Sequence, residues 1–400
     1  MIAARRILFA ILLTLVSLAG FPAGANRIGE ADQAGRILIA DPSPALRTYL
    51  IGSGFIVESM ERLEAFDISL MVVDAPQHLP AAAALRDLQM WFPTAIVARD
   101  TTFELAHDVR AGRGKLADAR QVLIAIGWQS SEAEPGTGLR VGVIDSSVDL
   151  HHSALQGAAI VQRQFTSGKP ATPDTAHGTA IAAMLVGRSN DRSVSGLLRG
   201  ATLYYASIFQ DGKRGPIASG ADFLRGVNWL IKSGATVINA SVTSPSENPV
   251  VLYAMSLLSR EKIILVAAAG NRGPSGPPVY PAAIPSAFAV TAVSIKGDAY
   301  RYANVGDYID IAAPGIDMPT TSRKITSGTS LAVPFVTAAV ARLVQLCGVS
   351  PLEAEVSLQA NARDLGPRGW DSHFGWGLLQ AQPRCGRTGA VADVGASGAR

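Results

Sequence analysis

The chain lacks the sequence patterns that identify the commonest non-protein ligands. Its formal net charge is only +3 and its aromatic content 6%, whereas nucleic-acid binding requires clustered Lys and Arg interleaved with aromatic residues. No G-x-G-x-x-G motif follows an expected strand and opens a helix, so a nucleotide-binding α/β protein is excluded as well. We therefore predict no nucleic-acid partner and no nucleotide cofactor.

Compact metal-binding patterns are also missing. The carboxylates are scattered along the sequence, and no D-x-D-x-D cluster of the kind that holds calcium occurs. The sequence thus predicts that no cofactor is required, and a structural calcium ion stays open.

Cysteine is almost absent, with two residues in 400, Cys347 and Cys385. In an oxidising compartment these two can form one disulfide, and the alternative is a pair of unrelated thiols. Pairing is favoured. The last residues, 384–400, are small and contain few apolar side chains, which predicts a disordered tail.

One long hydrophobic run starts the chain. Arg5 and Arg6 precede an apolar stretch over 7–18, and small residues follow up to Ala25. This layout predicts a secretory signal peptide over 1–25, with export to the periplasm or the medium and no membrane contact after cleavage. An uncleaved membrane anchor is the alternative. No later segment is predicted to span a membrane, because the apolar run 331–349 is assigned to the interior below.

A small domain is expected next, over 26–105. The pattern of apolar residues predicts strands and helices in the order β-α-β-β-α-β, which is typical of a ferredoxin-like domain. The expected strands lie at 36–40, within 55–63 and 66–73, and at 94–100, and the expected helices at 43–54 and 75–92. A linker and a helix follow over 106–138.

The remainder, 139–383, alternates strands that are apolar on both faces with helical stretches. Strands are expected at 139–145, 202–209, 235–241, 262–270, 287–293 and 308–315. Such runs predict a mostly parallel, doubly wound α/β sheet covered by helices on both sides. Functional sites in such sheets lie at the carboxyl ends of strands.

Three polar residues stand at the ends of these elements. Asp145 closes a buried strand, His177 begins a helix of small residues, and Ser330 begins a long apolar helix. Each alone has a structural interpretation, as a cap or a turn residue. Together they supply a nucleophile, a base that takes its proton, and a carboxylate that holds the base in the right tautomer.

The stretches around them resemble the motifs of the subtilisin-like serine proteases, or subtilases. "VGVIDSSVD" is similar to that family's aspartate motif, "HGTAIA" to its histidine motif and "SGTSLAVPFVTAAVA" to its serine motif, and Asp-His-Ser is the family's own order. The resemblance covers about 139–383. It implies an endopeptidase with an acyl-enzyme intermediate, acting as a monomer on polypeptides in extended conformation. It also accounts for Pro334, expected in the opening turns of the helix, where a missing N–H costs little.

Further roles are implied by the same resemblance. "VAAAGNRG" is similar to the family's oxyanion stretch, which assigns Asn271 as a hydrogen-bond donor to the developing oxyanion. The segments that would bind substrate contain Ser241, Val242, Thr243, Ala268, Ala269, Gly270 and Val279.

Two departures from the family pattern concern the pocket for the side chain before the cut. Thr243 and Val279 stand where the family often has glycine, and both side chains reduce the volume of the pocket. We expect a preference for small or medium aliphatic side chains. The alternative to an active protease is a pseudoprotease that binds extended peptides without cutting them.

The resemblance also implies a role for the domain over 26–105. Subtilases often carry such a domain as a folding catalyst and tethered inhibitor, removed by self-cleavage. The cut is expected within about 100–120, and a permanent accessory domain is the alternative.

Overall fold

The computed structural model describes residues 35–106, 116–129, 134–166, 175–188, 193–212, 215–259, 262–321, 325–383 and 385. The predicted signal peptide and nearly all of the predicted tail lie outside these residues.

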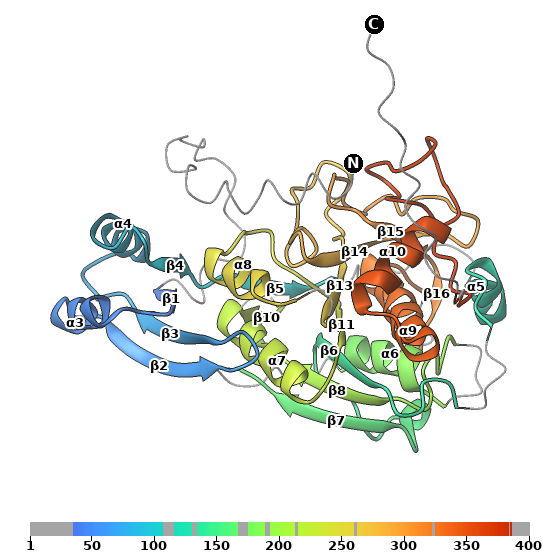
Figure 1. Ribbon diagram of the computed structural model, residues 1–400, viewed down its shortest axis with the longest axis horizontal. Helices are drawn as coiled ribbons and strands as arrows, with labels where there is room; N and C mark the ends of the chain where they lie inside the picture. Colours follow the sequence, from blue (N-terminus) through green and yellow to red (C-terminus); the bar gives the residue numbers. More distant parts are fainter. Residues whose placement is uncertain are drawn as a thin grey trace, which may run out of the picture.

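A seven-stranded sheet forms the centre of the large domain (Figure 1), and all its neighbouring strands run parallel. In spatial order the strands are β15 (Ile311–Pro314), β14 (Ala287–Val293), β13 (Ile264–Ala268), β11 (Val237–Ala240), β6 (Arg140–Asp145), β8 (Thr202–Ser207) and β7 (Ala159–Gln164). Strands β11, β13, β14 and β15 are buried along their whole length, as their continuous apolar sequence predicts, whereas edge strand β7 is partly exposed.

Helices cover both faces of this sheet. Helices α6 (Ala176–Val186), α9 (Thr329–Cys347) and α10 (Pro351–Asn361) share a core with one face, as does α5 (Ala119–Ala125). Helices α7 (Gly220–Lys232) and α8 (Pro249–Ser256) pack on the other. Of the described helices only α9 is long and apolar enough to cross a membrane, but 78% of its most apolar window is buried inside the protein. It is the central core helix.

The order in which successive strands are added to the sheet reverses at β6. Strands β7 and β8 lie on one side of β6, and β11, β13, β14 and β15 on the other. Connections therefore diverge at the carboxyl end of β6, which leaves room for a site there. Asp145 is the last residue of this strand.

The amino-terminal domain, residues 36–99, has its own antiparallel sheet in the order β2-β3-β1-β4. Its elements are β1 (Arg36–Ala40), α3 (Pro44–Gly52), β2 (Ile56–Leu63), β3 (Ile68–Asp74), α4 (Ala81–Trp91) and β4 (Ile96–Arg99). This order and topology are those of a ferredoxin-like domain. Helix α4 begins later than the sequence pattern indicated, because Pro80 takes the N-cap position.

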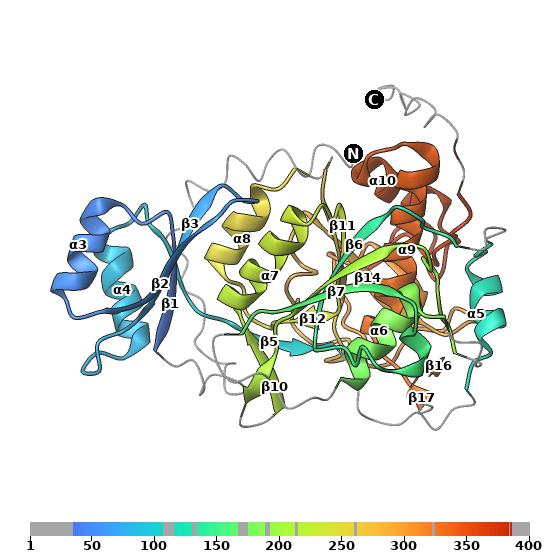
Figure 2. The same cartoon turned by 90° about the horizontal axis from the view of Figure 1, so that it is seen from below.

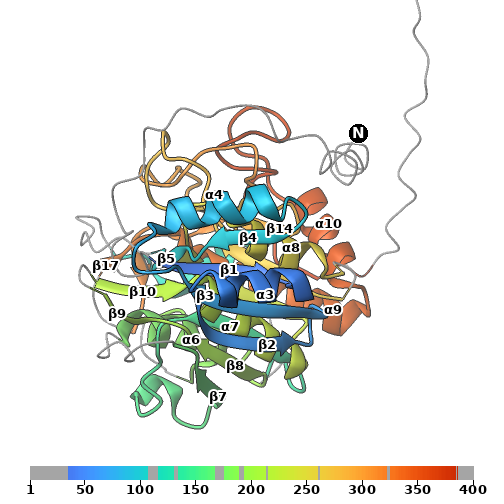
Figure 3. The same ribbon diagram turned by 90° about the vertical axis from the view of Figure 1, so that its left-hand side faces the viewer.

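Both faces of that sheet are buried, but against different partners. Along β1, Ile37 and Ile39 face α3 and α4, whereas Leu38 and Ala40 join the core formed with α7 and α8 of the large domain. Figures 2 and 3 show α3 and α4 on the outer side of the sheet, away from the large domain. The two domains thus share one apolar core.

Strand β5 (Thr102–Leu105) carries the chain from the small domain into the large one (Figure 2). It pairs antiparallel with β12 (Val242–Thr243) on one side and with β10 (Gly215–Ser219) on the other. The sequence analysis missed β5, β10 and the short β9 (Gln210–Gly212) that pairs with β10. Each spans at most five residues, too few for periodicity to identify.

Polar contacts supplement the shared core between the domains. Arg225 of α7 donates to Glu61 at 2.7 Å and to Ser59 at 2.9 Å. Asp100 is fully buried beside the amino terminus of α7, where the backbone N–H of Gly220 donates to its carboxylate at 2.7 Å. Arg36 lies 3.7 Å from the other carboxylate oxygen.

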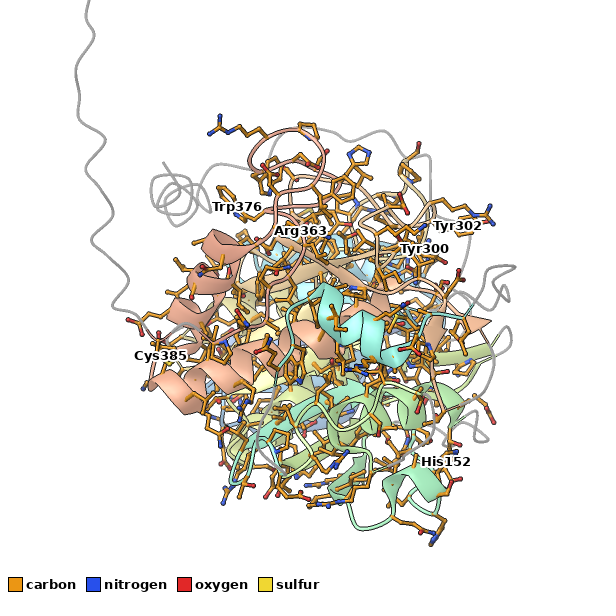
Figure 4. The ribbon with its side chains drawn as sticks, turned by 90° about the vertical axis from the view of Figure 1, so that its right-hand side faces the viewer. His152, Tyr300, Tyr302, Arg363, Trp376 and Cys385 are labelled. Carbon is orange, nitrogen blue, oxygen red and sulfur yellow. A yellow bond between two sulfur atoms is a disulfide. The ribbon has the colours of Figure 1, made fainter. Side chains whose placement is uncertain are left out.

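The carboxyl end of the chain is fixed by a disulfide between Cys347, the last residue of α9, and Cys385 (Figure 4). Pairing was the favoured prediction. The expected disordered tail is wrong at Cys385, because the disulfide holds this residue to α9; the other residues of the tail, 384 and 386–400, lie outside the described residues. A small hairpin of β16 (Met318–Pro319) and β17 (Ile325–Thr326) completes the described elements.

Burial of Asp100 predicts a pH-dependent stability. Burial raises its pKa from 3.8 to about 7, although Arg36 opposes the shift. A carboxyl group with a raised folded pKa stabilises the folded chain at low pH, and this contribution is lost as the pH rises from about 4 to 7. Between pH 5 and 8 we expect the unfolding free energy to fall by about 3 kcal/mol more in the native sequence than in Asp100→Asn.

Denaturant titrations at both pH values, on chains that also carry Ser330→Ala, measure this difference. Asp67→Asn removes an exposed carboxylate of the amino-terminal domain and should keep the full pH slope. An identical slope in Asp100→Asn would contradict the assignment.

Candidate active site

Asp145 and His177 form a buried pair at the carboxyl end of β6. His177 Nδ1 lies 2.7 Å from Asp145 Oδ1, and the backbone N–H of Ser146 donates to the same oxygen at 2.6 Å. Asp145 is fully buried and His177 is 9% exposed. The carboxylate therefore holds one ring nitrogen of His177, as the sequence predicted.

The glycine after His177 is required by this contact. A Cβ at Gly178 would lie 2.5 Å from the carbonyl oxygen of Ser147 and 2.8 Å from that of Ser146. Its N–H donates to Ser146 Oγ at 3.1 Å, and its carbonyl accepts from the buried hydroxyl of Tyr205 at 3.3 Å. Burial, and after it the charge of Asp145, raises the pKa of Tyr205, so this hydroxyl stays a neutral donor. Only glycine brings the first turn of α6 this close to Asp145.

Ser330 lies in the first turn of α9, but it does not cap that helix. The N-cap residue is Gly328, and no side chain caps α9. The Ser330 hydroxyl is buried and makes no hydrogen bond within the described part of the chain. This leaves its oxygen available for chemistry.

Pro334 lies in the second turn of α9, so its expected position in the opening turns is confirmed, but the expectation that the missing N–H costs little there is wrong. A proline there removes the hydrogen bond to the carbonyl four residues earlier, which belongs to Ser330. Ser241 Oγ donates to that carbonyl instead, at 3.1 Å, and Ser241 Oγ in turn accepts from Asn239 Nδ2 at 3.0 Å. Thr337 Oγ1 donates to Asn239 Oδ1 at 3.2 Å. A buried polar chain thus fixes the backbone of Ser330.

Asn271 holds the carbonyl at the end of β5. Its Nδ2 donates to the carbonyl oxygen of Ala106 at 2.7 Å. Its Oδ1 accepts from the backbone N–H of Thr329 at 3.0 Å and from the Thr329 hydroxyl at 3.1 Å, which fixes the orientation of the amide. The sequence reasoning missed Thr329, although it directly precedes Ser330.

The carbonyl of Ala106 and the Ser330 hydroxyl both lie close to Gly328. A Cβ built on Gly328 would lie 3.2 Å from Asn271 Nδ2, 3.3 Å from the Ala106 oxygen and 3.5 Å from Ser330 Oγ. A serine oxygen, an amide donor and a peptide carbonyl are therefore neighbours at one point. This is the arrangement in which an oxyanion would be stabilised.

The predicted substrate strand, residues 241–243, contacts the chain's own segment 104–106. The N–H of Ala106 donates to the carbonyl of Ser241 at 3.1 Å, and Leu105 and Glu104 pair with Val242 and Thr243. Ala106, predicted as the first linker residue, is buried with an exposed fraction of 2%. We call the place that segment 104–106 occupies, between residues 241–243 and Asn271, the cleft.

The other predicted segment lies beside the amide of Asn271. Ala268, Ala269 and Val279 are fully buried. The N–H of Gly270 donates to Thr329 Oγ1 at 3.1 Å, and a Cβ on Gly270 would lie 2.8 Å from Val279 Cγ2. Val279 thus packs directly against Gly270, and the expected loss of pocket volume stays a prediction.

Two further residues touch the segment in the cleft and were not found from sequence. Phe223 of α7 stacks on Phe103, with ring centroids 4.7 Å apart. Arg272 Nη2 lies 2.8 Å from Glu104 Oε2. The alternating residues Thr-Phe-Glu-Leu were the one available signal for a strand here.

The described part of the chain contains no group of three His, Cys, Asp or Glu side chains that could hold a metal ion. His152, at the start of the short helix η1 (Ser153–Leu155), accepts from the N–H of Ala154 at 3.1 Å (Figure 4). The His152 side chain thus caps the start of η1.

A family model described as "Subtilase family" matches residues 136–377, more than half of the chain. The chain belongs to the subtilase family. The domain that carries Asp145, His177 and Ser330 is the matched part.

The relatives that match this chain in sequence include the following two. The minor extracellular protease Epr of Bacillus subtilis is 30% identical over 253 residues, which cover 61% of this chain and 38% of that protein. Subtilisin BL of Lederbergia lenta is 30% identical over 254 residues, which cover 62% of this chain and 90% of that protein. The family and these relatives support a serine endopeptidase. Because the chain spans little more than a third of Epr, the activity of that whole protein is not carried over.

Solved structures extend the likeness in fold. Fervidolysin from Fervidobacterium pennivorans matches with a TM-score of 0.69 at 22% identity, covering 87% of this chain and 60% of that one. The protease PagA matches with a TM-score of 0.52 at 25% identity, covering 66% of this chain and 96% of that one. The first match shows the fold alone, and it extends beyond the part of this subtilase that the family model covers.

Asn271→Ala should lower the rate of peptide hydrolysis by roughly two to three orders of magnitude, because one donor to the developing oxyanion is lost. Steady-state kinetics on a peptide substrate measure kcat directly. Asn361→Ala removes an amide from the distant helix α10 and should leave kcat unchanged. An Asn271→Ala enzyme with native kcat would contradict the assigned role.

Proposed function

We propose that this subtilase is an exported serine endopeptidase, made as a zymogen that cuts its own chain after Ala106. The observation that carries the proposal is the Ala106 carbonyl, which accepts a hydrogen bond from Asn271 Nδ2 beside the Ser330 hydroxyl. The chain's own segment thus lies in the cleft as a substrate would.

The proposed chemical cycle starts from the contact between Asp145 and His177. Asp145 accepts a hydrogen bond from the Nδ1–H of His177, which leaves the other ring nitrogen to take the proton of Ser330. Ser330 Oγ then attacks the carbonyl carbon of Ala106, and the negative oxygen that forms is held by Asn271. His177 returns the proton to the leaving amine of His107, and the peptide bond breaks. Water, activated by His177, hydrolyses the acyl-enzyme and restores Ser330.

The amino-terminal domain acts as a tethered inhibitor until it dissociates. Support comes from its placement: its sheet shares a core with α7 and α8, and β5 fills the gap between β12 and β10. While β5 is paired with β12 and β10, no substrate chain can pair with these two strands. The expected signal peptide and export belong to the same proposal, because a zymogen protects the cell that makes the protease.

Small or medium aliphatic side chains are preferred before the cut. Ala106 is itself small, and Val279 packs against Gly270 beside the cleft. Polypeptides in extended conformation are the substrates, because β12 and β10 offer strand edges to the bound chain.

Labelling with a fluorophosphonate tests the proposed chemistry. The native chain should be labelled at Ser330 and should lose its residues up to Ala106, whereas Ser330→Ala should show neither. The product size on a gel and the amino-terminal sequence of the large fragment identify the cut. A folded native chain that is neither labelled nor cut would favour a peptide-binding pseudoprotease.

The pocket size is tested by Ala106→Phe. A phenylalanine does not fit beside Val279, so self-cleavage should slow by about 10- to 100-fold. A time course of processing after refolding measures the rate. Ala82→Phe places the same side chain on the exposed face of α4 and should process at the native rate. Equal rates for both variants would contradict a small pocket.

A further inference from the structure

We infer that Arg272 selects substrates with an acidic side chain at the third residue before the cut. The inference rests on the proposed function, because it treats Ala106 as the residue before the cut. Glu104 is then the third residue before it, and Arg272 Nη2 lies 2.8 Å from Glu104 Oε2.

The pairing of β5 determines which way Glu104 points. Leu105 pairs with Val242 and Glu104 with Thr243, so successive side chains of β5 alternate between two sides. Phe103 is buried against Phe223 on one side, whereas Glu104 is 39% exposed at its side chain and reaches Arg272. Any extended chain that pairs with β12 in this register presents its third residue to the same guanidinium.

Arg272 is held in place by the loop that carries it. Its N–H donates to Asn304 Oδ1 at 2.8 Å, and Asn304 Nδ2 donates to the carbonyl of Pro277 at 2.7 Å. The next residue, Gly273, donates to the carbonyl of Tyr302 at 2.8 Å. Because Arg272 directly follows Asn271, the bond that fixes the loop also fixes the backbone of Arg272 relative to the reacting carbonyl. Arg272 is thus a specificity-determining residue and not a catalytic one.

The expected size of the effect is modest. Both side chains are partly exposed, at 34% and 39%, and exposed ion pairs of this kind change binding by about 2- to 5-fold. Screening by salt should weaken the preference further, because the two charges are in contact with water.

The test uses the full chain after it has matured, with three peptides that differ at one residue. They contain Phe-Glu-Leu-Ala, Phe-Gln-Leu-Ala or Phe-Lys-Leu-Ala before the cut and share the same residues after it. For the native enzyme, kcat/KM should be about 2- to 5-fold higher for the Glu peptide than for the Gln peptide, and lowest for the Lys peptide. In Arg272→Glu the order of the Glu and Lys peptides should reverse.

Arg188→Glu is the matched control. Arg188 is 35% exposed and pairs with Glu134 at 2.8 Å outside the cleft, so its replacement should keep the native ratio of the three peptides. The native preference should also shrink when the salt concentration rises from about 0.05 M to 1 M.

Two results would overturn the inference. Equal kcat/KM for the three peptides would refute the role of Arg272 and leave the protease proposal intact. An Arg272→Glu enzyme that still prefers the Glu peptide would assign the selection to another group. Absence of any cleavage or labelling would instead refute the proposed function, and the inference with it.

Discussion

The pairing of β5 with β12 and β10 joins the two domains and fills the cleft at the same time. Backbone hydrogen bonds fix the register, so Ala106 reaches Asn271 while Phe103 reaches Phe223. The shared apolar core between the amino-terminal sheet and helices α7 and α8 supports this pairing from one side. Without the strand, the described contacts between the two domains would be that core, hydrogen bonds such as those of Ser59 and Asp100, and a few partly exposed ion pairs, which contribute little by themselves.

In helix α9, a hydrogen bond that Pro334 cannot make is replaced by one from a side chain of the candidate active site. Pro334 deprives the Ser330 carbonyl of its helical partner, and the side chain of Ser241 supplies the missing donor. The carbonyl of the same residue, Ser241, accepts from the N–H of Ala106. One residue therefore holds both the backbone of Ser330 and the segment that is proposed to be cut, which couples their relative positions.

The fold and the contact between Asp145 and His177 were largely predictable from the sequence. Continuous apolar strands required a buried parallel sheet, and the glycine after His177 reflects a contact that leaves no space for a Cβ. The position of the chain in the cleft was not predictable, because β5 has only four residues and its partners lie far away in sequence. Arg272 and Glu104 are 168 residues apart, and only the strand register brings them together.

Pro334 was misjudged for a related reason. Its sequence position near the start of a helix suggested a free N–H site, but α9 begins at Thr329 and encloses the proline. The compensating donor, Ser241, comes from a different strand connection. Sequence patterns describe one element at a time, whereas this compensation depends on two.

The amino-terminal sheet has a consequence for what would happen after the proposed cut. Leu38, Leu70 and Val72 are fully buried in the core shared with the large domain. Once separated, the fragment exposes this apolar face to water, which lowers its own stability and favours unfolding. An unfolded fragment is a good substrate for the enzyme it has just left. The fragment would therefore inhibit the enzyme only once, and its degradation would make activation irreversible.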